Sequence, residues 1–89
     1  MSREARHKHP NIVPCLVQPF EKACEHGGFR YVALVFARRG PHLLFAAEYA
    51  RRFGVGRLDA SGEIAHSTQY PTLDSASHAF LAAPAGLEA

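Results

Sequence analysis

The chain has 89 residues, of which 47% are hydrophobic and 20% are charged, and its formal net charge at pH 7 is +2. This length suits one small domain with a single core and excludes a second lobe that encloses a substrate. The modest charge does not favour a dedicated nucleic-acid binder, and no apolar run approaches the roughly 18 residues of a membrane span. Because the first residues also lack an apolar secretion segment, we expect a cytoplasmic protein that does not bind membranes.

Charged residues are distributed unevenly along the chain. All ten Lys and Arg residues lie at or before Arg57. Residues 1–57 hold ten basic and four acidic groups, a net charge of +6, whereas residues 58–89 hold four acidic groups and have a net charge of −4. This polarity indicates either an anionic partner for the basic part or mutual neutralisation of the two parts, within one fold or between two copies.

The composition divides the chain into three parts. We predict a disordered basic tail at residues 1–10, a single α+β domain at residues 11–84 and a flexible C-terminus at residues 85–89. Residues 12–17 are apolar, but the prolines within and beside this segment restrict any strand there to the edge of a sheet or prevent it.

The segment from Pro19 to Ala37 is predicted to form a short helix and then a strand. Proline at position 19 suits the first turn of a helix, and Gly27 can take the left-handed conformation that ends one. Residues Phe29–Ala37 carry apolar side chains on both faces of an extended chain, which is typical of a central strand covered on both sides or of a strand that lends one face to a partner chain.

The segment His42–Phe53 is interpreted as a second helix. Pro41 fits its first turn and Gly54 its end, and four apolar residues form a stripe at helical spacing. An alternative interpretation makes Leu44–Arg52 a long strand of a meander. The stripe of the helical interpretation consists of Leu43, Ala47, Ala50 and Phe53.

A hairpin and a last helix complete the predicted elements. Residues Val55–Ser67 are interpreted as the hairpin, because Asp59 can bond the backbone of the turn and Gly62 can adopt a positive φ. Thr72 is predicted to cap the helix, which closes before Pro84.

The elements together predict an α+β fold with a small three- to four-stranded, mostly antiparallel sheet and two to three helices packed on it. Its core is predicted to contain Leu34, Phe36, Leu58, Ile64 and Phe80.

Cys15, Cys24 and His26 are the one tight cluster of soft metal ligands. A structural zinc site combines two close ligand pairs, whereas here eight residues separate the cysteines and the C-x-H pair stands alone. Neither cysteine lies at a predicted helix N-terminus, where a thiolate would be stabilised. We therefore expect no catalytic residue, no cofactor and no resident metal, although the spacing leaves occasional metal binding by these three residues open.

Arginines supply the candidate binding site. Arg38 and Arg39 follow the predicted strand and would meet the N-terminus of the 42–53 helix, whose free N–H groups favour an anion. Further arginines would gather at the opposite end of the sheet. The residues predicted to bind a partner or an anion are Arg38, Arg39, Arg51, Arg52 and Arg57.

Charge polarity, surplus apolar surface and the lack of a reactive constellation favour a small regulatory, accessory or inhibitor protein that acts without catalysis. We expect another protein as its partner, and also a homodimer. The alternative is a nucleic-acid-binding regulator that uses the arginines of the first two-thirds of the chain. That alternative needs aromatic side chains beside the basic residues, and we expect Phe29, Tyr31 and Phe36 in the core, which leaves Tyr49 and Tyr70.

Overall fold

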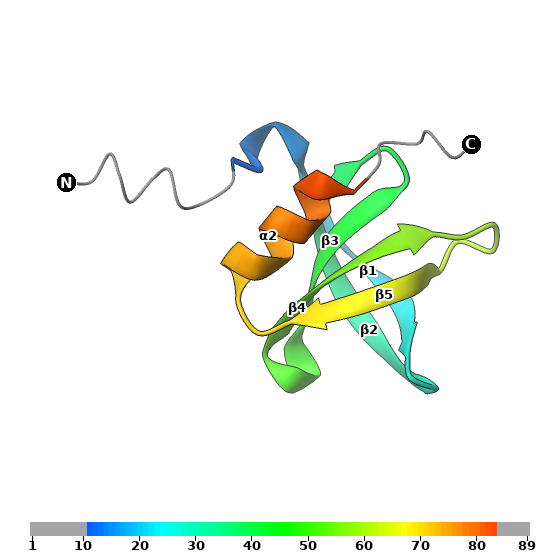
Figure 1. Ribbon diagram of the computed structural model, residues 1–89. Coiled ribbons are helices and arrows are strands. Elements are labelled where there is room, and N and C mark those ends of the chain that lie inside the picture. Colours follow the sequence, from blue (N-terminus) through cyan, green and yellow to red (C-terminus); the bar gives the residue numbers. More distant parts are fainter. Residues whose placement is uncertain (1–10, 84–89) are drawn as a thin grey trace.

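A computed structural model describes residues 11–83 (Figure 1). The predicted tail at residues 1–10 and the predicted flexible end at residues 85–89 lie outside this range. Within it, no helix is both long enough and apolar enough to cross a membrane.

Five strands form a closed barrel in which each strand pairs antiparallel with the next (Figure 1). A meander with an odd number of strands begins and ends in the same direction, so the last strand closes on the first in parallel, through the pair Cys24 and Ile64. The elements are η1 (Val13–Cys15), β1 (Leu16–His26), β2 (Phe29–Arg39), β3 (His42–Ala47), η2 (Glu48–Ala50), β4 (Arg52–Leu58), β5 (Ile64–Tyr70) and α2 (Leu73–Ala82).

The predicted fold, with three or four strands and two or three helices, is wrong. The barrel has five strands, and α2 is the one α-helix within residues 11–83. Residues 42–53 form β3, η2 and the start of β4, so the alternative of a strand in a meander is closer than the helix. Leu43, Leu44 and Phe45 are all buried, because β3 lies between the barrel interior and α2. A strand covered on both faces is a continuous apolar run, which also contains a helical stripe.

The helix predicted after Pro19 is also wrong, since this segment belongs to β1. The proline lies where the pairing of β1 with β2 shifts, between Leu16 and Phe20. At such an irregularity the regular hydrogen bonds between the strands are already interrupted, so a residue without an N–H group is tolerated. β1 therefore continues through a residue that would otherwise interrupt a strand.

Three local predictions are confirmed. Residues 29–37 lie within β2, although the strand is not covered on both sides as one interpretation predicts, since Val32 is 61% exposed. β4 and β5 form the predicted hairpin with Leu58 opposite Ile64. The side chain of Thr72 accepts a hydrogen bond from the backbone N–H of Ser75 at 3.1 Å and so caps α2. Each of these elements contains the residue that starts, turns or caps it, so its prediction does not depend on contacts with distant parts of the chain.

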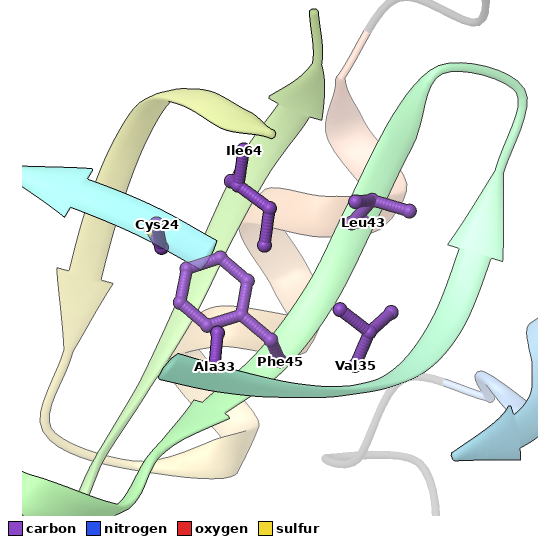
Figure 2. Packing of buried hydrophobic residues seen from close by; sticks show 6 residues of the cluster. All are labelled: Cys24, Ala33, Val35, Leu43, Phe45 and Ile64. Atoms are coloured by element: carbon purple, nitrogen blue, oxygen red, sulfur yellow. The ribbon is translucent and has the colours of Figure 1, made fainter. Parts of the chain in front are cut away.

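Buried side chains form two clusters on the two faces of the β-sheet. The first fills the barrel and contains Phe45 among smaller residues (Figure 2). The second lies between α2 and the outer face of β3, β4 and β5, and contains Leu44 and Phe80. Of the predicted core, Ile64 and Phe80 are buried, whereas the other three residues are only half-buried. Those three are Leu34, Phe36 and Leu58.

The ring of Phe45 fits into the barrel because glycine stands opposite it on β4. Gly54 pairs with Phe45, and a Cβ atom at this glycine would lie 2.4 Å from two carbons of the ring. No side chain fits at that distance, so the absence of a Cβ is a packing requirement here.

Candidate binding site

The predicted arginines have different roles in the structure. The Nη2 atom of Arg39 donates to the carbonyls of Phe80 at 3.3 Å and Leu81 at 2.8 Å, and also to that of Ala83. This guanidinium therefore covers the C-terminus of α2. The Nε atom of Arg38 donates to the Gly40 carbonyl at 3.0 Å. The segment predicted to form a helix beside this pair is the strand β3, so it provides no helix N-terminus for an anion site.

Arg51, Arg52 and Arg57 do not form a single cluster, because the first two lie at the start of β4 and the third near its end. Arg51 is exposed and takes a left-handed backbone with φ of 54° after η2. The Nη2 atom of Arg52 donates to the Gln69 carbonyl at 3.5 Å. The roles of the five arginines in partner or anion binding stay predictions.

The two cysteines belong to different clusters. Cys24 lies inside the barrel, whereas Cys15 packs against the cluster beneath α2. Among residues 11–83, no three His, Cys, Asp or Glu residues are grouped so that they could hold a metal ion.

An aromatic patch, formed by Phe29, Tyr31 and Tyr49, lies where β2 begins and η2 joins β3 to β4. The ring centroids are 5.1 Å apart between Phe29 and Tyr49, 4.7 Å between Tyr31 and Tyr49, and 6.1 Å between Phe29 and Tyr31. The half-buried Tyr31 also lies 6.5 Å from the ring of Phe45. The patch is therefore a continuous extension of the barrel core to the surface.

Hydrogen bonds fix the two tyrosines of the aromatic patch. The Nε2 atom of Gln69, on β5, donates to the hydroxyl oxygen of Tyr31 at 3.2 Å and to that of Tyr49 at 2.9 Å. The thiol of Cys24 donates to the Tyr31 oxygen at 3.3 Å. Burial, and after it the hydrogen bond with this thiol, raises the pKa of Tyr31 well above its usual value. Its phenol is therefore neutral at physiological pH and serves as a fixed hydrogen-bonding group.

Sequence reasoning missed this patch because it places Phe29 and Tyr31 in the core. Phe29 is 51% exposed and Tyr49 is 53% exposed. The local signal is the turn Gly27–Gly28, directly before Phe29. A strand that starts at a hairpin tip projects beyond the core, so its first side chains are the least covered.

A cavity of about 330 Å³ lies between the two hairpin tips, and it is lined by Glu25, Asp59, Glu63 and His66 among others. The carboxylate of Asp59 accepts hydrogen bonds from the N–H of Ser61 and of Glu63, both at 2.9 Å. Glu63 binds Arg30 at 2.9 and 3.2 Å.

These partners lower the pKa of both carboxyls. The backbone N–H of Glu63 is the largest influence on Asp59, and the guanidinium of Arg30 is the largest on Glu63. Both groups thus hold the hairpin tips in place. Within one chain, Arg30 of the basic part neutralises Glu63 of the acidic part.

No protein-family model matches this sequence, and the comparisons with characterised proteins and with solved structures give no match either.

Proposed function

We propose that this protein is a small, non-catalytic binding module that docks another protein on the aromatic patch. One observation carries the proposal: Phe29 and Tyr49 expose about half of their surface, while Tyr31 anchors them to the core. Aromatic side chains that are already fixed lose little conformational freedom on binding. Aromatic residues are enriched at the positions that contribute most of the binding energy of protein interfaces.

The residues around the aromatic patch indicate which kind of partner surface would fit it. Val32 is also 61% exposed, but the alternation of side chains along β2 places it on the opposite face of the strand from Phe29 and Tyr31. Arg51 and Arg52 follow Tyr49 closely, and Arg51 is exposed. A partner surface with an apolar centre and an acidic rim complements this arrangement, with the charges setting register and association rate.

Single-stranded nucleic acid is the second candidate ligand. Phe29 and Tyr31 pack on Tyr49, which precedes Arg51 by two residues, so aromatic side chains lie near basic ones as base stacking requires. Two features favour a protein. The rings of Tyr31 and Phe29 are each tilted by 47° to that of Tyr49, and the carboxylate of Glu48 is exposed directly before Tyr49.

The test combines Phe29→Ala with Tyr49→Ala and measures affinity for the partner that the unaltered chain captures from its native source. After identification of this partner, isothermal titration calorimetry gives the dissociation constants. We expect the double variant to bind roughly tenfold or more weakly, because central aromatic residues dominate interface energies. Leu73→Ala, at a 41% exposed apolar residue on α2, is the control and should bind normally.

Two results would overturn the proposal. One is an unchanged affinity of the double variant for the captured protein. The other is capture of nucleic acid, with an affinity that falls steeply as salt rises. For a protein partner, replacing Arg51 and Arg52 by Glu should slow association at low salt and much less at high salt. Sedimentation of the same variants tests whether the partner is a second copy of the chain.

A further inference from the structure

The hydrogen bonds within the aromatic patch all run in one direction. The Nε2 atom of Gln69 donates to the hydroxyl oxygen of Tyr31 at 3.2 Å and to that of Tyr49 at 2.9 Å. This amide nitrogen carries two hydrogens, so both are used in the two bonds. Gln69 therefore acts as a donor towards both tyrosines, and each phenol accepts a hydrogen bond on its oxygen.

The hydroxyl hydrogen of Tyr49 points to a group outside the patch. A phenol that accepts a hydrogen bond still has one O–H to donate. Within residues 11–83, this O–H meets no acceptor, and the side chain of Tyr49 is 53% exposed. Tyr49 therefore presents a hydrogen-bond donor to a molecule that covers its ring.

Two further groups at the patch are donors. The oxygen of Tyr31 accepts from Gln69 and, at 3.3 Å, from the thiol of Cys24, so neither neighbour uses the phenol hydrogen. Burial raises the pKa of Tyr31, so this hydrogen stays on the phenol at physiological pH. Arg51, two residues after Tyr49, is exposed, and a guanidinium can only donate.

A ligand that matches this surface combines hydrogen-bond acceptors with flat apolar groups. Along an α-helix the backbone carbonyls already accept hydrogen bonds within the helix, so a helix offers few acceptors. A polyproline II helix has no internal hydrogen bonds, and its carbonyls are open to the surroundings. Each proline also lacks an N–H group, so a proline-rich segment has more acceptors than donors.

We propose that the aromatic patch binds a proline-rich segment of its protein partner in the polyproline II conformation, an inference that rests on the proposed function of the patch. The rings of Phe29 and Tyr49 contact proline rings, and the phenol of Tyr49 donates to a carbonyl of the segment. The three ring centroids of the patch lie 4.7 to 6.1 Å apart. Together with the width of the rings, this distance spans about one turn of the segment, roughly 9 Å.

Both surfaces are ordered before they meet. A proline-rich segment is already extended, and the rings of the patch are held by Gln69 and by one another, so little conformational freedom is lost on binding. The exposed carboxylate of Glu48, directly before Tyr49, would repel the phosphates of a nucleic acid. The uncharged carbonyls of prolines do not meet this repulsion.

The experiment titrates the ¹⁵N-labelled chain with a blocked peptide of about eight prolines, which forms a polyproline II helix in water. We expect saturable shifts of the backbone amides of Phe29, Tyr31 and Tyr49. A blocked glycine–serine peptide of the same length is the control. It should cause no saturable shift, because it is flexible and has no rings to place on the aromatic side chains.

Two variants test the direction of the hydrogen bonds. Gln69→Glu keeps the shape of the side chain but replaces the donor by an acceptor, so both phenols donate inward and peptide binding should weaken about tenfold. Tyr49→Phe keeps the ring and removes the outward donor, so binding should weaken roughly threefold to tenfold. Tyr70→Phe is the matched control, because it removes the same atom from a tyrosine beneath α2. Because Tyr49 is exposed, Tyr49→Phe carries the test if Gln69→Glu fails to fold.

The proposal fails if the proline peptide causes no saturable shifts at the patch. It also fails if Gln69→Glu and Tyr49→Phe bind the peptide as tightly as the unaltered chain and Tyr70→Phe do. Either result leaves the proposed function intact, provided that Phe29→Ala with Tyr49→Ala still loses the captured partner. If this double variant binds the captured partner normally, the proposed function fails, and the inference about its partner fails with it.

Discussion

The two sides of the barrel differ in what covers them. On the outer face of β3, β4 and β5, α2 covers the sheet, and Leu44 and Phe80 are fully buried beneath it. On β2, Val32 projects from the opposite side to the buried Ala33 and is 61% exposed. Apolar side chains of similar kind therefore stabilise the fold on one side and remain available to a partner on the other.

This difference separates stability from binding. The covered side has a capped helix, an arginine that covers the helix end and a cluster that joins η1 to α2. The less covered side has β2 and η2 but, within residues 11–83, no α-helix over it, and the exposed rings of Phe29 and Tyr49 continue from the interior of the barrel through Tyr31. Substitutions on the covered side should lower the stability of the fold, whereas those on the other side should alter binding.

The sharpest test of the comparison replaces one apolar residue on each side. Phe80→Ala should lower the free energy of unfolding by about 3–5 kcal/mol, since it removes a fully buried ring. Val32→Ala should change it by about 0.5 kcal/mol or less, as exposed positions do. Chemical denaturation followed by circular dichroism measures both values. Similar losses for the two variants would contradict the division.

Both sides of the sheet depend on the packing of the barrel interior. A substitution at Gly54 tests how tightly this interior is filled. Gly54→Ala should destabilise by about 1–3 kcal/mol, because the new methyl group would overlap the ring of Phe45. The same substitution beside Phe45→Leu should be less harmful, since the overlap is then reduced. A double-mutant cycle in urea gives the coupling. Strict additivity would show that the ring is not what Gly54 accommodates.

The packing of α2 on the barrel depends on Arg39. Arg39→Ala should cost about 1.5–3 kcal/mol, because the carbonyls at the end of α2 lose a charged donor. Arg38→Ala is the matched control and should change little, since Arg38 is exposed and donates a hydrogen bond to the carbonyl of Gly40 in the adjacent turn. Thermal unfolding of the two variants measures the difference. Equal melting temperatures would mean that α2 does not rely on this arginine.

The sequence predicts the elements whose signals are local. The apolar run of the strand Phe29–Ala37, the turn at Asp59 and the cap at Thr72 each lie within the element that they define, and these elements are confirmed. The segment 42–53 carries helical and extended patterns at once. Only its pairing with β2 and β4, far away in the sequence, decides between them.

The candidate sites depend even more on distant contacts. The aromatic patch needs β2, η2 and Gln69 of β5 to meet, and the hollow of about 210 Å³ beside Ala79 needs α2 to lie against three strands. The prediction of Arg38 and Arg39 relies on a helix that starts at residue 42, where the structure has β3. Of the five arginines, Arg57 lines a hollow beside α2 and Arg39 covers the end of this helix, a distinction that only the packing of α2 makes.

The smallest expected effect concerns pH and the hairpin tips on the less covered part of the barrel. Asp59 and Glu63 have lowered pKa values, so each contributes stability above its unfolded pKa and loses it as the pH falls through the folded value. The ordinary value for aspartate is 3.8. Asp59→Ala should therefore lower the melting temperature at neutral pH.

The deficit of Asp59→Ala should shrink once the pH lies below the folded-state pKa of Asp59, because the protonated carboxyl no longer accepts hydrogen bonds from three donors of the turn. Both groups are exposed, so added salt should also reduce the contribution of the Arg30–Glu63 pair. Glu48→Ala, at an exposed carboxylate of η2, is the control. A deficit that stays constant from neutral to strongly acidic pH would mean that this turn is held by its backbone and not by the ionised side chain of Asp59.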